Sequence, residues 1–317
     1  MKPFKNFTQL AKHFNNELTC ALFLEEQRWG GKPLCPHCGS EYHSRTQTRF
    51  KHPELKEYKD FRCKACDKKY TVLTGSVYES SHISLQTWFQ AVYLISAHKK
   101  GISSLQLASD LGVTQKTAWF MLHRLRKCFV DTFTEKLGVN GEVVETDETI
   151  VGGKTHNKTR EYRNRVRDGK VDPMGNKSIV MGMIQRKDKL YMQVLSGKSQ
   201  ILSSVANNVS TNASLITDSS GVYKSIKNTY PKHEIIDHSS DEYVRGNIHT
   251  NSIEGAFSLF DRMVIGIYHF VSPKHLQRYC DEFMFRWNHR RLTDVEKFVE
   301  TLKKCDNTRL QYKDLIS

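Results

Sequence analysis

The stretch Val143-Val-Glu-Thr-Asp147 decides how the centre of this chain folds. Its β-branched residues alternate with polar ones, which is typical of a half-buried strand. The segments around it carry apolar residues at strand or helix spacing: strands at 178–185, 190–195, 214–217 and 234–236, and helices at 201–209, 222–229, 251–265 and 273–289. The turn at 186–189 makes the second and third strands a hairpin. The pattern therefore predicts a mixed α/β domain.

Three separated carboxylates fall where such a domain would bring them together. Asp147 and Asp218 each end a predicted strand, and Glu254 lies in the first turn of the helix that begins near Asn251. Such a cluster is costly without cations, and its hard oxygen ligands suit two Mg²⁺ or Mn²⁺ ions acting on a phosphodiester. Each residue also has an ordinary interpretation: a strand-end charge, a turn residue, or part of an Asn-x-x-Glu capping box.

Two cysteine pairs, Cys35-Pro-His-Cys38 and Cys63-Lys-Ala-Cys66, lie nearer the N-terminus. This spacing predicts a zinc ribbon in which four thiolates hold one structural Zn²⁺, with chance placement of buried cysteines as the alternative. Four thiolates leave no open coordination position, so this metal would stabilise the fold only. The other cysteines show no pairing pattern: Cys20, Cys128, Cys280 and Cys305. This usage favours a reducing compartment.

The segment from Leu107 to Arg126 has the layout of a helix-turn-helix. A short helix ends at Gly112, and a second helix follows Thr114, which we expect to be its N-cap. The side chains expected to contact DNA are Thr114, Gln115, Lys116, Thr117, Arg124 and Arg126. The alternative is an ordinary helical pair with a solvated charged face.

The charge of the chain favours a polyanionic partner. Lys and Arg number 48 against 34 Asp and Glu in 317 residues, a formal net charge of +14. Each contact with a phosphate releases counterions, so such an excess favours nucleic acid. No apolar run approaches the roughly 20 residues that cross a bilayer, and no apolar signal region opens the chain. We therefore expect a cytoplasmic protein, associated with the nucleoid when bound to double-stranded DNA.

In their order and spacing these segments resemble bacterial insertion-sequence DDE transposases with an N-terminal zinc ribbon, a group related to the Merlin-type DNA transposons. The likeness covers roughly residues 7 to 291. The matching segments are 35–40, 107–126, Val144-Glu-Thr-Asp-Glu-Thr-Ile-Val-Gly-Gly-Lys154, Leu215-Ile-Thr-Asp218, His249-Thr-Asn-Ser-Ile-Glu-Gly255, 267–279 and 283–291.

The resemblance implies a ribonuclease H-like catalytic fold with Asp147 and Asp218 as metal ligands. Members of the group carry Glu, Asn or His as the third ligand, so Asn251 competes with Glu254. We favour Glu254, because an anionic group binds Mg²⁺ better than an amide. Some relatives carry a basic residue about two turns later, a role that would fall here to Arg262, since Asp261 holds the equivalent position.

The expected architecture is multidomain α+β. Its parts are an N-terminal helical segment (1–33), a zinc ribbon (34–78), a helix-turn-helix domain (79–138), a ribonuclease H-like DDE catalytic domain (139–291) and a C-terminal helical tail (292–317). The implied activity is that of a DNA transposase that binds terminal inverted repeats and catalyses metal-dependent hydrolysis and strand transfer, as a homodimer or larger assembly on DNA. The alternatives are a catalytically inactive or domesticated DNA-binding regulator, and a nuclease that cuts without joining.

Overall fold

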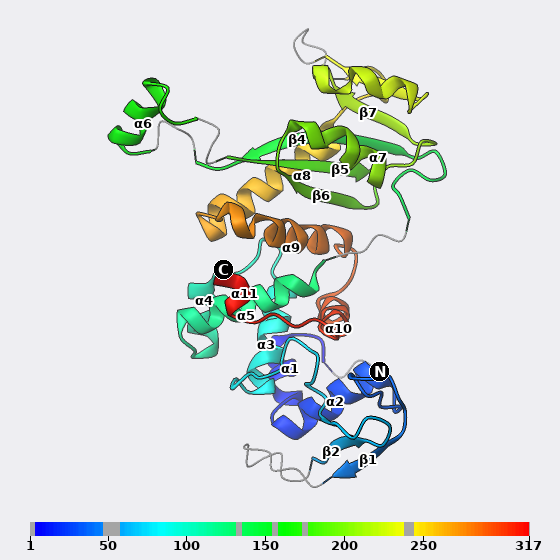
Figure 1. The fold of residues 1–317 in the computed structure, drawn as a ribbon, viewed down its shortest axis with the longest axis vertical. Helices are drawn as coiled ribbons and strands as arrows, with labels where there is room; N and C mark the ends of the chain where they lie inside the picture. Colours follow the sequence, from blue (N-terminus) through cyan, green and yellow to red (C-terminus); the bar gives the residue numbers. More distant parts are fainter. Residues whose placement is uncertain are drawn as a thin grey trace. The chain divides into compact units, whose positions relative to one another are not determined.

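The computed structural model describes residues 4–46, 58–130, 135–153, 158–172, 177–237 and 244–316. The chain forms two compact units, Met1–Phe129 with His289–Ser317 and Val130–Asn288 (Figure 1). The expected C-terminal tail at 292–317 therefore belongs to the same unit as the N-terminal segments. Within the described ranges, no helix combines the length and the apolar character needed to cross a membrane.

The first unit opens with two helices, both within the helical segment expected at 1–33. They are α1 (Phe7–His13) and α2 (Glu17–Trp29). The break falls at Asn16, whose side-chain oxygen accepts the Thr19 N–H at 2.8 Å and so caps α2. An Asn that bonds backbone donors in this way starts a helix and does not continue one.

A small antiparallel sheet follows, with strands in the order β1 (His43–Thr46), β2 (Asp60–Cys63) and β3 (Lys69–Tyr70). Its apolar centre is the stacked pair of Phe61 and Tyr70, whose ring centroids lie 5.1 Å apart. This centre is small, so the sheet depends on further stabilisation.

The rest of the first unit is helical: α3 (Leu85–Ala97), α4 (Ser104–Leu111), α5 (Gln115–Cys128), α10 (Asp294–Lys304) and α11 (Lys313–Ile316). The expected turn between α4 and α5 is confirmed, since Gly112 has φ +65° and Thr114 Oγ1 accepts the Thr117 N–H. The α10 helix packs on α3, where the ring of Phe298 contacts those of Phe14 and Phe89.

A five-stranded sheet in the order β6-β5-β4-β7-β8 forms the second unit. The strands are β4 (Val143–Val151), β5 (Ser178–Gln185), β6 (Leu190–Leu195), β7 (Ser214–Asp218) and β8 (His233–Ile236). The first three are antiparallel, whereas β7 and β8 run parallel to β4. Asp147 lies within β4, not at its end as expected, because β4 continues to Val151 along β5.

Helices cover both faces of this sheet. On one face α8 (Asn251–Met263), its π-helical extension η6 (Val264–Tyr268) and α9 (Leu276–Asn288) bury a core against β5 and β6, and the short η7 (Pro273–His275) leads into α9. The other face carries η3 (Lys198–Gln200), α7 (Ile201–Asn208) and the 3₁₀ helix η4 (Gly221–Asn228). Between β4 and β5 lies the helix α6 (Arg160–Arg167), which is rich in arginine and has no buried residue.

Candidate active site

The three carboxylates expected as metal ligands come from two neighbouring strands and one helix of the second unit. Parallel pairing of β4 with β7 places Glu145 opposite Ile216, so Asp147 and Asp218 follow two residues further along the two strands. Asp147 is half-buried, and burial raises the pKa of its carboxyl to about 7. The Glu148 N–H donates to Asp147 at 2.7 Å and lowers this pKa, whereas the charges of Glu148, Asp218 and Glu254 raise it further. These carboxylates therefore lie within electrostatic reach of Asp147.

Local hydrogen bonds hold the other two expected ligands. Asp218 Oδ1 accepts the Ser220 N–H at 3.1 Å, in the turn that leads into η4. The exposed Glu254 accepts a hydrogen bond from the Thr250 hydroxyl at 2.6 Å. Thr250 is the N-cap residue of α8 and its own side chain accepts no backbone N–H of the helix, so the capping box expected from Asn251 to Glu254 is not formed. Asn251 is exposed at the first position of α8.

Glu148 is a fourth carboxylate that the sequence analysis did not assign to the site. Successive residues of a strand point to opposite faces, so Glu148 leaves β4 on the face that carries Tyr223. The Tyr223 hydroxyl donates to its carboxylate. Burial raises the pKa of Glu148, the Tyr223 hydrogen bond lowers it, and the charge of Asp218 raises it again. The feature of the sequence that could have identified Glu148 is its position next to Asp147, which makes a pair of adjacent acidic residues.

Arg262, expected as an auxiliary basic residue, is exposed on α8. Its Nε donates to the Ser258 carbonyl one turn earlier at 3.0 Å. The structure thus places it on the same helix as Glu254, two turns further along.

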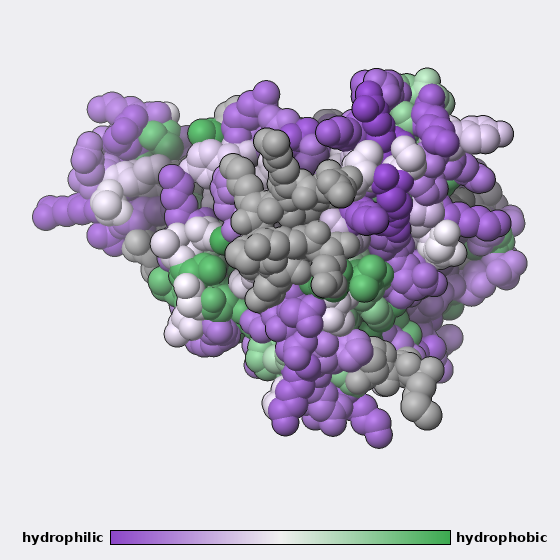
Figure 2. Space-filling model, turned by 90° about the horizontal axis from the view of Figure 1, so that it is seen from below, coloured by the Kyte–Doolittle hydropathy of each residue, from purple (hydrophilic) through white to green (hydrophobic). Residues whose placement is uncertain are grey.

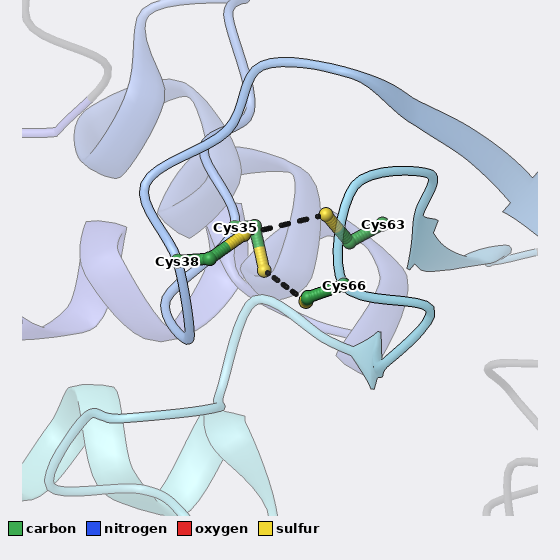
Figure 3. A group of neighbouring side chains, drawn as sticks. All are labelled: Cys35, Cys38, Cys63 and Cys66. Atoms are coloured by element: carbon green, nitrogen blue, oxygen red, sulfur yellow. Dashed lines mark hydrogen bonds between the residues drawn. The ribbon is translucent and has the colours of Figure 1, made fainter.

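The four ribbon cysteines converge, as Figure 3 shows. Their sulfurs all lie within 4.8 Å of one another, with 3.7 Å from Cys35 to Cys66 and 3.6 Å from Cys38 to Cys63. A tetrahedral site with Zn–S bonds of about 2.3 Å needs sulfurs about 3.8 Å apart, so the cluster fits zinc. The Cys66 N–H, followed by the Ala65 N–H, lowers the pKa of the Cys63 thiol to about 6 against the opposing effect of burial.

The start of α5 presents the polar residues expected to contact DNA. Thr114, Gln115 and Lys116 are exposed there, and Thr117 is half-buried. Each already has a partner within the first unit: Thr114 binds Thr117, Gln115 Nε2 donates to Ser104 Oγ at 2.8 Å, and Lys116 Nζ lies 5.2 Å from the Tyr312 ring centroid.

Arg124 and Arg126 depart from the expectation that they contact DNA. Their exposed fractions are 6% and 1%. The Arg124 guanidinium donates to three backbone carbonyls, those of Val77 (2.6 Å), Glu79 (3.1 Å) and Leu310 (3.2 Å). Both side chains therefore belong to the interior, because this face of α5 packs inside the unit. The partners of Arg124 are distant in sequence, so no local pattern predicts the contact.

Comparison with known proteins agrees with this combination of modules. Residues 138–288 match the model of the ISXO2-like transposase domain, and residues 15–69 match that of the transposase zinc-ribbon domain. A curated relative, the uncharacterized protein in transposable element ISH50 of Halobacterium salinarum, is 25% identical over 291 residues, covering 87% of this chain and 92% of that protein. No solved structure matches the chain.

Both matched domains are transposase domains, and they account for most of the chain. The chain belongs to the insertion-sequence transposases of the DDE type with an N-terminal zinc ribbon.

Proposed function

We propose that this chain is a DNA transposase that binds the terminal inverted repeats of its own element and catalyses metal-dependent phosphodiester hydrolysis and strand transfer. The observation that carries the proposal is the carboxylate cluster, in which burial and neighbouring charges raise the pKa of Asp147 to about 7. A carboxyl group whose pKa is raised in this way without a cation is suited to bind one. The match to a transposase domain over these residues supports the same activity.

The topology of the second unit supports a ribonuclease H-like catalytic fold. A three-stranded antiparallel meander is followed by helices that alternate with two strands parallel to β4. The acidic residues lie on the adjacent strands β4 and β7 and on α8, which covers one face. This is the arrangement that the family resemblance implies.

Asp147, Asp218 and Glu254 would hold two Mg²⁺ or Mn²⁺ ions, with Asn251 as the alternative third ligand. When bound, such ions activate a water or a 3′-hydroxyl and stabilise the charge on the leaving oxygen. The chain itself orients the ligands: the Ser220 N–H holds Asp218, and the Thr250 hydroxyl holds Glu254. Because the pKa of Asp147 is about 7, part of its population is protonated near neutral pH, and that proton would be released when a cation binds.

Double-stranded DNA is the proposed partner, and two ends must be paired, so the working complex is at least a homodimer. Thr114 to Thr117 at the start of α5 would contact the element ends. The exposed arginines of α6 would add phosphate contacts: Arg160, Arg163, Arg165 and Arg167. The face in Figure 2 is largely hydrophilic, with hydrophobic residues in small separate areas, as suits a polar partner. We place this activity on nucleoid DNA in the cytoplasm.

A strand-transfer assay tests the proposal. Purified full-length protein is incubated with Mg²⁺ or Mn²⁺ and DNA that carries the repeats flanking the gene, with Asp218→Asn as the matched variant. We expect joined products from the wild type alone, while both proteins shift the end DNA equally in a gel. Cutting without joining would identify a nuclease, and binding without cutting a regulator. Equal loss of binding and joining in the variant would remove Asp218 from the active site.

A further inference from the structure

Glu145 is a fully buried carboxylate on β4, two residues before Asp147 and on the same face of the strand. One of its oxygens, Oε2, accepts the N–H groups of Ser252 (2.8 Å) and Ile253 (3.0 Å) in the first turn of α8. The other, Oε1, accepts from the Ser252 hydroxyl at 2.9 Å and from Arg186 Nε at 2.5 Å. Glu145 thus joins the strand of Asp147 directly to the helix of Glu254.

Arg186 extends this connection to the segment that leads into α8. Besides Glu145, its guanidinium donates to the carbonyls of Asn247 (2.7 Å) and His249 (2.9 Å). His249 Nδ1 in turn lies 3.6 Å from Glu145 Oε1. A buried charge is tolerated when it is paired and fully hydrogen-bonded, and the positive end of the α8 dipole adds to the pairing. These contacts define one position for the start of α8.

A second, independent feature fixes the approach of α8 to the sheet. Gly182 lies on β5 directly opposite Asp147. A Cβ atom at Gly182 would lie 2.7 Å from side-chain atoms of Ile253 and Phe257, both buried on α8. The side chains of α8 therefore pack directly against the backbone of Gly182 beside Asp147. Any larger residue at this position would push α8 away from the sheet.

We propose that Glu145 is a positioning residue of the carboxylate site. By holding the first turn of α8 against β4, it sets the place of Glu254, and of Asn251, relative to Asp147. The inference rests on the proposed function, because it assigns Glu145 to the support of that site and not to contact with metal or DNA. Without this hold Asp147 and Asp218 keep their places on the sheet, but Glu254 loses its fixed distance from them.

Glu145→Gln in the full-length protein is the test. Glutamine keeps the size of the side chain but replaces one acceptor oxygen with an NH₂ group that faces donors. Mn²⁺ binding is measured by calorimetry without DNA, alongside the Mn²⁺ dependence of cleavage and melting curves with and without Mn²⁺. The matched control is Glu142→Gln just before β4, where the carboxylate accepts from the backbone N–H and the side-chain amide of Asn140.

We expect Glu145→Gln to weaken Mn²⁺ binding about tenfold or more, as substitutions that support metal ligands do. The Mn²⁺ concentration for half-maximal cleavage should rise by the same factor. Mn²⁺ should also raise the melting temperature of this variant less than it raises that of the wild type. Glu142→Gln should leave all three unchanged. A variant that melts lower but binds Mn²⁺ as the wild type does would make Glu145 merely structural and overturn the inference.

Two further measurements separate the possible failures. If Glu145→Gln does not fold, Ser252→Ala removes one donor and leaves the Glu145–Arg186 pair intact; it should weaken Mn²⁺ binding a few-fold, and unchanged binding would overturn the inference. If Mn²⁺ binding is absent from the wild type, or survives in Asp147→Asn, the proposed site itself is wrong and the inference falls with it.

Discussion

The four ribbon cysteines and the three carboxylates proposed as ligands are brought together on opposite principles. The ribbon takes its thiols from two short segments, which bring four sulfurs within 4.8 Å of one another. The carboxylate site takes one residue each from β4, β7 and α8, so only the folded sheet assembles it. A zinc ion would complete the set of thiolates, whereas burial and the charges of neighbouring carboxylates raise the pKa of Asp147. Zinc would therefore stabilise the ribbon, whereas the proposed carboxylate site would reduce stability in order to keep a function available.

The largest effect predicted from this comparison is on the ribbon. Cys63→Ser removes one thiolate from a site whose metal contributes on the order of 10 kcal/mol to folding, so the module should lose its zinc and unfold. Zinc content by atomic absorption and limited proteolysis between residues 30 and 80 measure this. The melting transition of the second unit serves as the internal control and should not change. Retention of one zinc per chain by this variant would contradict the four-thiolate site.

Asp147→Asn should have the opposite sign on stability. The pKa of Asp147 rises from 3.8 to about 7 on folding, so ionising it costs stability progressively between pH 4 and pH 7, and fully above pH 7. The shift corresponds to at most about 4 kcal/mol. We expect the metal-free variant to melt a few degrees above the wild type at pH 8 and to match it near pH 4, by calorimetry at both values.

Metal should reverse this order. Mn²⁺ raises the melting temperature of the wild type at pH 8, and less at pH 6 because protons then compete for Asp147. The asparagine variant should gain nothing at either pH. If the variant gains as much melting temperature from Mn²⁺ as the wild type does, Asp147 is not a ligand. If the variant melts lower than the wild type without metal at pH 8, ionising Asp147 does not cost stability.

The smallest effect concerns α6, where no metal is involved. Replacing Arg160, Arg165 and Arg167 with Gln should weaken DNA binding by about tenfold and lower the salt dependence of the binding constant by about one ion per lost phosphate contact. Fluorescence anisotropy from 50 to 200 mM salt measures both. Glu161→Gln on the same helix is the control and should strengthen binding slightly. An unchanged salt dependence in the triple variant would remove α6 from the DNA interface.

The sequence predicted what depends on local pattern. The cysteine pairs, the strand at 214–217 and the N-cap at Thr114 all follow from spacing and residue type within a few positions, and each is confirmed. By contrast, β4 continues past Asp147 because it pairs with β5 as far as Val151, and the alternation of residues alone did not predict this length.

Long-range contacts determine the positions of Arg124 and Glu145, which the sequence did not predict. Arg124 is a residue type that often contacts DNA, but its guanidinium donates to the carbonyl of Leu310, which is distant in the sequence. Glu145 resembles any polar position in a strand until Arg186 and Ser252 are placed beside it. In both cases a charged side chain is buried because distant groups satisfy it, and residue type alone does not reveal such partners.

The first unit is discontinuous, and this has a consequence for biosynthesis. Residues 289–317 are translated after the second unit, yet they supply Phe298 to the aromatic core of the first unit and Leu310 to the guanidinium of Arg124. The second unit is therefore translated in full before the first can finish folding. A nascent or truncated chain that stops before residue 289 would therefore hold all of the second unit but only part of the first.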